Sequence, residues 1–498
     1  MVATEDLFSI EEYKGYARDI GLVTGAHIAV SLLHFIRLPI LTKWLGASLY
    51  GTWSLIWVTI VLITPVAMLG LGTAFIRFLA VERDVSRIRE GFLSMVFTIL
   101  AAGAFFSIVL ILCSDLIASS VLGDINNSSH LVRLASFMIL TQAISEMSIA
   151  FFRTFRQLKL YSTLMAMKAV VQVGLMVCFL LLGGEIRGVI FAVLASDILC
   201  IAIAFSVALR QMGFQLPKFT ELKDYLKYGL PLVPSAAILW IIQSSDRYMI
   251  GYFMQAEDVG IYTSAYTLTY IISLFLRPIQ VVLLPTISKS YDDGDMSKTK
   301  TYLKFSLKYL MMLSIPAAFG LSILASPLLR LLTTSEFVSG NVVIPLIACG
   351  ILFYGYYQVC MHILYLVKKT YWLVRLLGIS AALNIALNLL LIPKLGIVGA
   401  AVATLIAFAS LGILTIVISF RHFKFDLGYF FIIKSILASA VMSTAIWLFK
   451  PSGVTEVIIA ILLGIIIYFA MILVLKGFNK RELYLLKDLA RFKSRHYQ

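Results

Sequence analysis

The chain has 498 residues, of which 60% are hydrophobic and only 13% charged, and its formal net charge is +15. This composition excludes an ordinary soluble globular protein. The positive charge alone would suit a nucleic-acid-binding protein, but its distribution along the chain favours a membrane-topology signal instead.

Apolar segments long enough to cross a bilayer follow one another along most of the sequence. About 20 apolar residues span the hydrocarbon core as a helix, and only helices satisfy the backbone hydrogen bonds of such long spans. We therefore predict an all-α polytopic membrane protein with about 14 transmembrane helices. In chain order the predicted spans are 21–41, 50–72, 91–113, 133–152, 161–183, 188–209, 228–252, 260–285, 304–329, 342–367, 371–392, 396–419, 428–448 and 454–475.

Basic residues gather in every second connection between these spans. Arg83, Arg153, Lys223 and Lys289 lie in such connections, whereas the alternate connections hold at most one Lys or Arg each. The positive-inside rule then predicts a protein of the cytoplasmic membrane with both termini in the cytoplasm. Segments 1–20 and 477–498 are the predicted cytoplasmic ends, and apolar residues such as Leu7 and Leu485 give each a candidate interfacial helix face.

The sequence contains an internal repeat. Without gaps, Ala47, Gly51 and Trp53 align with Ala256, Gly260 and Tyr262, and a second match sets Gly188 against Gly399 at nearly the same offset. A repeat unit with an even number of spans gives both copies the same orientation. We therefore predict two parallel six-helix lobes, 21–212 and 219–421, followed by two further helices within 425–476.

Ionisable side chains inside the predicted spans are candidates for function, because charges in hydrocarbon are costly. One face of the first span is polar, and later spans add arginines, one of them beside a kink-forming proline, Pro278. We predict a hydrated, cationic central cavity that binds an anionic group, since arginine suits phosphate. The candidate substrate ligands are Arg37, Arg247, Arg277, His34, Gln243 and Asn384. Alternatively, Asp246 and Arg247 pair with the other lobe and lock the helix bundle, and Arg37 extends towards the membrane surface.

Acidic residues within the spans are the candidates for binding a coupling cation: Asp246, Asp197 and Glu146. Lys168 joins the last two in a predicted polar network. No catalytic, nucleotide-binding or metal-binding motif is present, so we predict a transporter without a catalytic residue, metal or cofactor. Energy is then expected from a H⁺ or Na⁺ gradient, or from the substrate itself.

Three stretches resemble the multidrug/oligosaccharidyl-lipid/polysaccharide exporter superfamily: 383–404 with its Asn384, Asn388 and Pro393, 246–265, and 70–77. The last resembles the polysaccharide-transporter branch. The resemblance implies a V-shaped pair of lobes around a central cavity. It also implies an O-antigen-type flippase that moves a polyprenyl-(pyro)phosphate-linked oligosaccharide outward, with the arginines at the phosphate. Implied partners are that substrate, membrane lipids, and glycosyltransferases or a polymerase of the same pathway, but no nucleic acid.

Three alternatives remain open from the sequence. A multidrug antiporter of the same superfamily would favour an acidic and aromatic site, and a lipid II flippase would share the phosphate chemistry. A membrane-embedded glycosyltransferase or polymerase would need a catalytic acid in an outward loop, where only Asp115 and Asp124 are available. The glycan, the lipid carrier and the coupling ion stay undetermined at this point.

Overall fold

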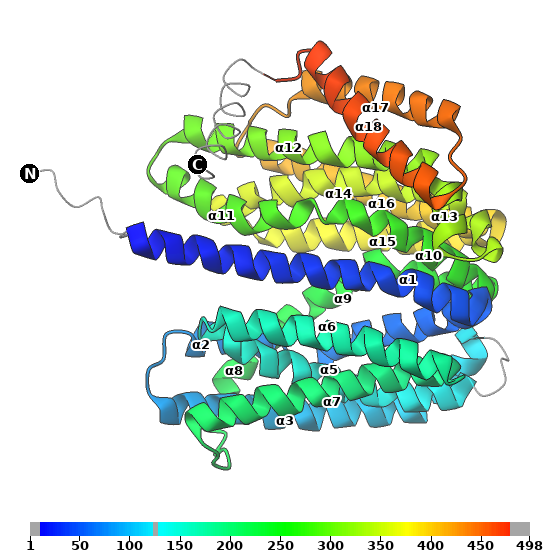
Figure 1. Ribbon diagram of the computed structural model, residues 1–498. Helices are drawn as coiled ribbons and strands as arrows, with labels where there is room; N and C mark the ends of the chain where they lie inside the picture. The colour runs from blue at the N-terminus through cyan, green and yellow to red at the C-terminus, as the bar shows by residue number, and fades with distance from the viewer. Residues whose placement is uncertain (1–9, 123–127, 479–498) are drawn as a thin grey trace, which may run out of the picture. The chain divides into compact units, whose positions relative to one another are not determined.

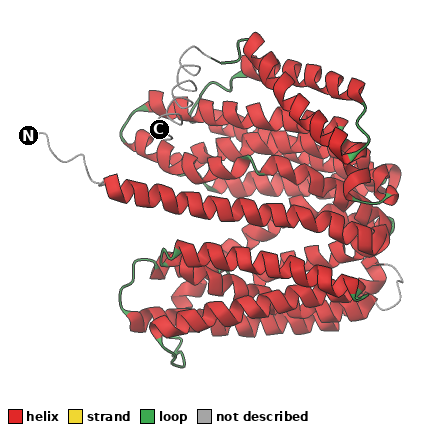
Figure 2. Ribbon diagram, viewed as in Figure 1, coloured by secondary structure: helices red, strands yellow, loops and turns green. Residues whose placement is uncertain are grey.

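The computed structural model describes residues 10–122 and 128–478, and the secondary structure within these ranges is entirely helical (Figure 2). The apolar faces predicted around Leu7 and Leu485 lie outside the described side chains. So does the side chain of Arg277. The chain packs as two compact units, residues 1–264 with 385–400, and residues 265–384 with 401–498. The predicted lobe boundaries at 212 and 219 stay predictions.

The first unit is built mainly from the N-terminal helices (Figure 1). Helices α3 and α5, α5 and α7, and α6 and α7 pack against each other, and α1 packs along α5, α6 and α9. Their bounds are α1 Ile10–Ala67, α2 Leu71–Leu79, α3 Val85–Leu112, α4 Ser114–Ile117, η1 Ala118–Leu122, α5 Ser128–Thr154, α6 Leu158–Leu181, α7 Glu185–Met212, α8 Leu222–Gly229, η2 Leu230–Leu232 and α9 Val233–Phe253.

The second unit is centred on α12, which packs against α11, α14 and α17, while α17 and α18 lie side by side (Figure 1). Its helices are α11 Leu276–Asp292, α12 Met296–Ile323, α13 Ala325–Leu332, η3 Ser335–Val342, α14 Val343–Leu366, α17 Tyr429–Phe449 and α18 Val454–Val474. Three helices have residues in both units: α10 Ala256–Ser273, α15 Tyr371–Leu395 and α16 Ile397–Phe420.

Within the described ranges, 12 helices are long and apolar enough to cross a membrane. The first of them contains a non-helical Gly46 (φ 70°) and takes in most of two predicted spans, 21–41 and 50–72, ending at Ala67. The predicted span 260–285 is interrupted in the structure, because α10 ends at Ser273 and α11 begins at Leu276, with a turn at Leu274 and Phe275 between them. A proline at position 278 has no N–H to donate to the preceding turn, which disfavours a continuous helix there. The total of about 14 spans stays a prediction.

Residues that align in the sequence repeat contact each other in the first unit. The hydroxyls of Ser54 and Thr263 are 2.9 Å apart, and the aligned Gly51 and Gly260 pack backbone to backbone. A Cβ on Gly51 would lie 1.6 Å from the carbonyl oxygen of Ala256, and one on Gly260 would lie 2.1 Å from that of Ala47. The contact is therefore reciprocal, as expected where two copies of one motif meet.

The second pair of aligned glycines, Gly188 and Gly399, makes the same kind of contact in both copies of the repeat: each packs closely on the preceding helix. Gly188, at the start of α7, packs on Phe179 of α6, and Gly399, at the start of α16, packs on Leu391 of α15. In each case a Cβ would lie within 3 Å of the neighbouring helix: 2.8 Å from the Cβ of Phe179 and 2.4 Å from the carbonyl oxygen of Leu391. Glycine at these positions lets each helix pair close into a tight hairpin.

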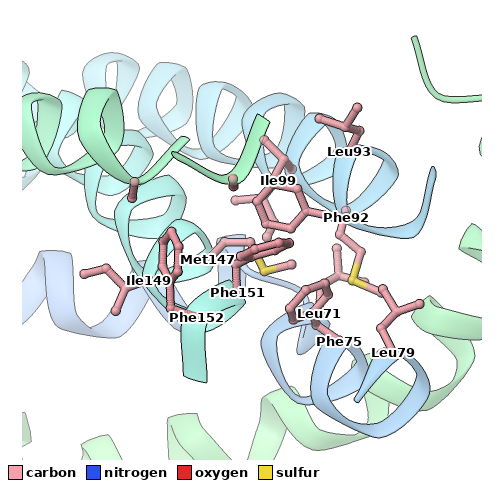
Figure 3. Packing of buried hydrophobic residues seen from close by; sticks show 14 of the residues in the cluster. Leu71, Phe75, Leu79, Phe92, Leu93, Ile99, Met147, Ile149, Phe151 and Phe152 are labelled. Carbon is pink, nitrogen blue, oxygen red and sulfur yellow. The ribbon is translucent and has the colours of Figure 1, made fainter. Parts of the chain in front are cut away.

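An aromatic cluster holds together α2, α3 and α5 in the first unit (Figure 3). The rings of Phe75 and Phe92 have centroids 5.6 Å apart, and Phe92 and Phe151 are 5.1 Å apart. The first pair of rings is tilted and the second is edge-on, and aromatic packing of these kinds adds to the free energy gained by close contact. The cluster packs against one face of α5. The rotation of this helix is thereby fixed, and its polar residues, such as Glu146, lie at a cavity.

Candidate functional site

A cavity of about 480 Å³ lies inside the first unit, among α1, α5, α6 and α7. Its volume falls within the range of roughly 300–1,000 Å³ that is typical of small-molecule sites. Three cationic and two acidic side chains line it, together with neutral polar and aromatic groups. These lining residues include His34, Arg37, Trp57, Gln142, Glu146, Arg153, Tyr161, Lys168, Gln172 and Asp197.

Arg37 of α1 is held in this cavity by an amide. Its Nη2 donates to Oε1 of Gln172 at 2.5 Å, while its Nε is buried and has no hydrogen-bond partner among the described residues. A guanidinium carries five donors, so this arrangement leaves hydrogen-bonding capacity free. His34, one turn earlier, lines the same cavity. Both residues of the predicted polar face of α1 thus lie at this cavity of the first unit, and their role as substrate ligands stays a prediction.

Lys168 of α6 and Asp197 of α7 form an ion pair in the cavity wall. The Lys168 Nζ lies 2.6 Å from Oδ1 of Asp197 and donates to the Ser145 hydroxyl at 3.0 Å. The other carboxylate oxygen accepts from Thr141 at 3.2 Å. Asp197 is completely buried, whereas the side chain of Lys168 is 21% exposed. The carboxylate is thus fixed from two sides, and the ammonium group reaches the cavity.

Glu146 of α5 is exposed to the cavity, between Gln142 one turn before it and Arg153 two turns after it. It lies within electrostatic range of Lys168, Asp197 and Arg153. Arg153 also faces the ring of Tyr161, with 6.0 Å between the guanidinium carbon and the ring centroid. Opposite charges therefore alternate around the cavity, with one more cation than anion when all are ionised.

Sequence reasoning missed Arg153, Gln142 and Gln172 as lining residues. The sequence alone assigns Arg153 to a basic cytoplasmic connection between two spans. The available signal was helical spacing: Gln142, Glu146 and Arg153 recur at four and seven positions on α5. On α6, Tyr161, Lys168 and Gln172 recur at the same kind of interval and line the same cavity.

The predicted residues of α9 form a separate group. Arg247 lies 3.4 Å from Oδ1 of Asp246 and donates to the backbone carbonyl of Gln243 at 2.8 Å. Asp246 also accepts a hydrogen bond from the buried Tyr262 hydroxyl at 2.5 Å. None of these side chains is among the described residues that line the 480 Å³ cavity. Asp246 and Arg247 thus contact each other within α9, and their predicted roles at a central cavity stay predictions.

Asn384 of α15 is buried in the second unit, at 1% exposure. The side chain of Arg277 lies outside the described residues, so its predicted role stays a prediction. Among the described residues, no group of three His, Cys, Asp or Glu side chains is arranged to hold a metal ion.

Comparison with protein families decides the family. Residues 16–291 match the family model described as "Polysaccharide biosynthesis protein". The chain belongs to this family. Residues 231–390 also match the MatE family, and the two matches together place the protein in the polysaccharide branch of the multidrug/oligosaccharidyl-lipid/polysaccharide exporter superfamily. Within it, the chain is a multi-pass membrane protein.

Relatives of this chain include two from Haloferax volcanii. "Probable low-salt glycan biosynthesis flippase Agl15" is 25% identical over 57% of this chain and 61% of its own length. "Probable flippase AglR" is 28% identical over 38% of this chain and 39% of its own. "Probable lipid II flippase MurJ" of Haemophilus influenzae is 25% identical over 45% and 47%. The chain thus matches between about two fifths and three fifths of the length of these relatives.

Solved structures show the fold. A lipid II flippase MurJ in an inward closed conformation superposes with a TM-score of 0.77, covering 93% of this chain and 99% of that one, at 19% identity. An inward-facing multidrug resistance MATE transporter superposes with a TM-score of 0.66 over 78% and 94%, at 15% identity. The relatives and neighbours with a stated role are flippases and transporters, not enzymes.

Proposed function

We propose that this protein is a flippase that moves a polyprenyl-(pyro)phosphate-linked oligosaccharide across the cytoplasmic membrane for polysaccharide biosynthesis. The observation that carries the proposal is Arg37, a cavity-lining guanidinium with an unpartnered Nε, accompanied by Lys168 and Arg153. Neither a phosphate nor a sugar crosses hydrocarbon unaided, because each loses its hydrogen bonds with water there. A polar cavity with cationic walls replaces those bonds for the headgroup, while the polyprenyl tail stays in lipid.

The chemistry of the cavity distinguishes this function from its competitors. An organic cation would meet three positive side chains against two carboxylates, which disfavours a multidrug antiporter. A lipid II flippase uses the same pyrophosphate chemistry, and the likeness to the Haemophilus influenzae relative makes it the second candidate. Gln142 and Gln172 offer amides that suit sugar hydroxyls in either case. A H⁺ or Na⁺ gradient is the proposed energy source, with Glu146 and Asp197 as the cavity's carboxylates.

Transport by purified protein in liposomes tests the proposal. A fluorescent polyprenyl-pyrophosphate oligosaccharide is supplied in both leaflets, and its transbilayer movement is followed by quenching from outside. We expect Arg37→Ala to slow movement by about tenfold or more, since a hydrogen bond to a charged group contributes roughly 1.5–3 kcal/mol. Arg37→Lys should keep part of the activity, because it keeps the charge but loses the planar fork.

The matched control is Arg330→Ala, which removes an exposed arginine outside the cavity and should leave movement unchanged. Equal rates for Arg37→Ala and the unmodified protein would overturn the role of Arg37. No movement of any lipid-linked sugar, with or without a H⁺ or Na⁺ gradient, together with transport of a dye cation, would overturn the flippase. Movement of lipid II in preference to other lipid-linked sugars would favour the second candidate.

A further inference from the structure

Two cations of the cavity depend on one carboxylate. Lys168 pairs directly with Asp197 at 2.6 Å, and Asp197 is also the acidic group that acts electrostatically on Arg37. The direct partner of Arg37 is a neutral amide, Gln172, which supplies no counter-charge. In a cavity without substrate, Asp197 is therefore the direct counter-charge of Lys168 and also acts on Arg37, while Glu146 acts on Lys168 without a direct ion pair.

The two side chains of the ion pair, Lys168 and Asp197, differ in how freely they can move. Asp197 is fully buried and is held by Thr141 as well as by Lys168. Lys168 is partly exposed, and a lysine ammonium sits on a flexible stem with three donors that rotate freely. Its second contact, the Ser145 hydroxyl at 3.0 Å, is neutral. The lysine is thus the member able to change partners, while the aspartate keeps its position.

We propose that Asp197 is an internal substitute for the phosphate of the substrate. In the empty protein it neutralises Lys168 and Arg37, and when a phosphorylated headgroup enters, Lys168 turns from the carboxylate to the phosphate. Asp197 is then a positioning residue, since it acts on substrate only through the two cations. This inference rests on the proposed function and adds a reason why the phosphorylated substrate can be released after transport.

The exchange has a consequence for a transport cycle. A flippase has to bind its substrate, release it, and return empty. A cavity with uncompensated buried cations would bind phosphate tightly and would be costly to leave empty. With Asp197 available, a charged partner for Lys168 exists in both states, so binding is weakened and release is eased. Removing the carboxylate should therefore strengthen binding and slow turnover together.

Binding of citronellyl pyrophosphate to the purified full-length protein in detergent tests the inference. We expect Asp197→Asn to bind this probe about tenfold more tightly, which is the effect of removing one competing charge partner, and to move lipid-linked oligosaccharide more slowly. Lys168→Gln should bind it about tenfold more weakly, because the cation that would meet the phosphate is gone. A role of the pair in folding alone predicts lower melting temperatures for both variants without opposite changes in affinity.

Asp197→Asn alone leaves Lys168 without its carboxylate partner and can fail to fold. The double variant Asp197→Asn/Lys168→Gln removes both charges and keeps side chains of similar size, so it provides a second test. Since Asp197 also offsets Arg37, the double variant should bind the probe more tightly than Lys168→Gln alone. The matched control is Asp115→Asn/Arg133→Gln, which replaces an exposed ion pair with N–O contact at 2.9 Å outside the cavity and should not change affinity.

The outcomes separate the two proposals. If unmodified protein binds the probe and moves lipid-linked sugar, but Asp197→Asn binds no tighter, the flippase stands and the role of Asp197 is overturned. The same holds if the double variant binds no tighter than Lys168→Gln. If unmodified protein neither binds the pyrophosphate probe nor moves lipid-linked sugar, the proposed function fails, and this inference fails with it.

Discussion

Two of the largely buried charged residues inside the described helices have a partner of opposite charge close by. Lys168 has Asp197 at 2.6 Å, and Arg247 has Asp246 at 3.4 Å. Burying a charge without a partner costs far more free energy than burying an ion pair. Each partner therefore lowers the cost of having a charged residue inside the membrane. Arg37 differs from these two, because its direct hydrogen-bond partner is a neutral amide.

Outside the spans, Asp426 makes an ion pair that should report on pH. Its Oδ2 lies 2.7 Å from the Lys304 Nζ and its Oδ1 accepts from the Gly428 N–H, and these contacts lower the pKa of Asp426 below its ordinary value of 3.8. A lowered pKa means that the folded protein binds fewer protons than the unfolded one. The stabilisation is therefore complete above pH 3.8 and is lost as the pH falls through the lower pKa of the folded state.

We expect Asp426→Asn to lower the free energy of unfolding at pH 7 by at most about 1 kcal/mol, because the pair is partly exposed. Melting curves in detergent at pH 7 and at pH 3 measure the difference, which should shrink at the lower pH. The exposed Asp293→Asn serves as the control and should melt like the unmodified protein. A difference that stays constant with pH would contradict the ion-pair explanation.

At the scale of helices, polar residues at helical spacing carry the site. Sequence reasoning found the face of α1 with His34 and Arg37, because its residues recur every three or four positions within a span. It did not assign the face of α5 that continues to Arg153, since that arginine stands near the end of the helix. Contacts between helices could not be predicted from the sequence. Arg37 and Gln172, for example, are 135 positions apart, and no periodicity links them.

The contact between the repeated motifs gives a prediction at this scale. Gly51→Ala should lower the free energy of unfolding by about 3 kcal/mol or more, because its Cβ would lie 1.6 Å from the Ala256 carbonyl oxygen and the two backbones would have to separate. Thermal unfolding in detergent measures the effect. The matched control is Gly174→Ala in α6, where a Cβ meets nothing within 4 Å and alanine favours the helix by up to about 1 kcal/mol. Similar melting temperatures for the two variants would contradict the close approach.

For the whole molecule, the alternating charge of the connections predicts the orientation. In a variant with the five native cysteines replaced, Ser452→Cys between α17 and α18 should react with a membrane-impermeant maleimide added to intact cells. Asp293→Cys, which follows α11, should react only after the membrane is opened. Both positions are exposed, so access to the reagent depends on their side of the membrane. The reverse pattern would overturn the predicted cytoplasmic location of both termini.

Composition and hydropathy determined the class of this protein and its helical architecture, because the bilayer imposes strict length and polarity rules on each span separately. The superfamily was indicated by the resemblance of three stretches, 70–77, 246–265 and 383–404. The sequence also named Arg37, His34, Glu146 and Asp197, since the cost of a charge in hydrocarbon makes each one conspicuous. Only the tertiary structure decided which of them share a cavity and which are paired. Those facts depend on how helices pack side by side, and the period of one helix carries no information about its neighbour.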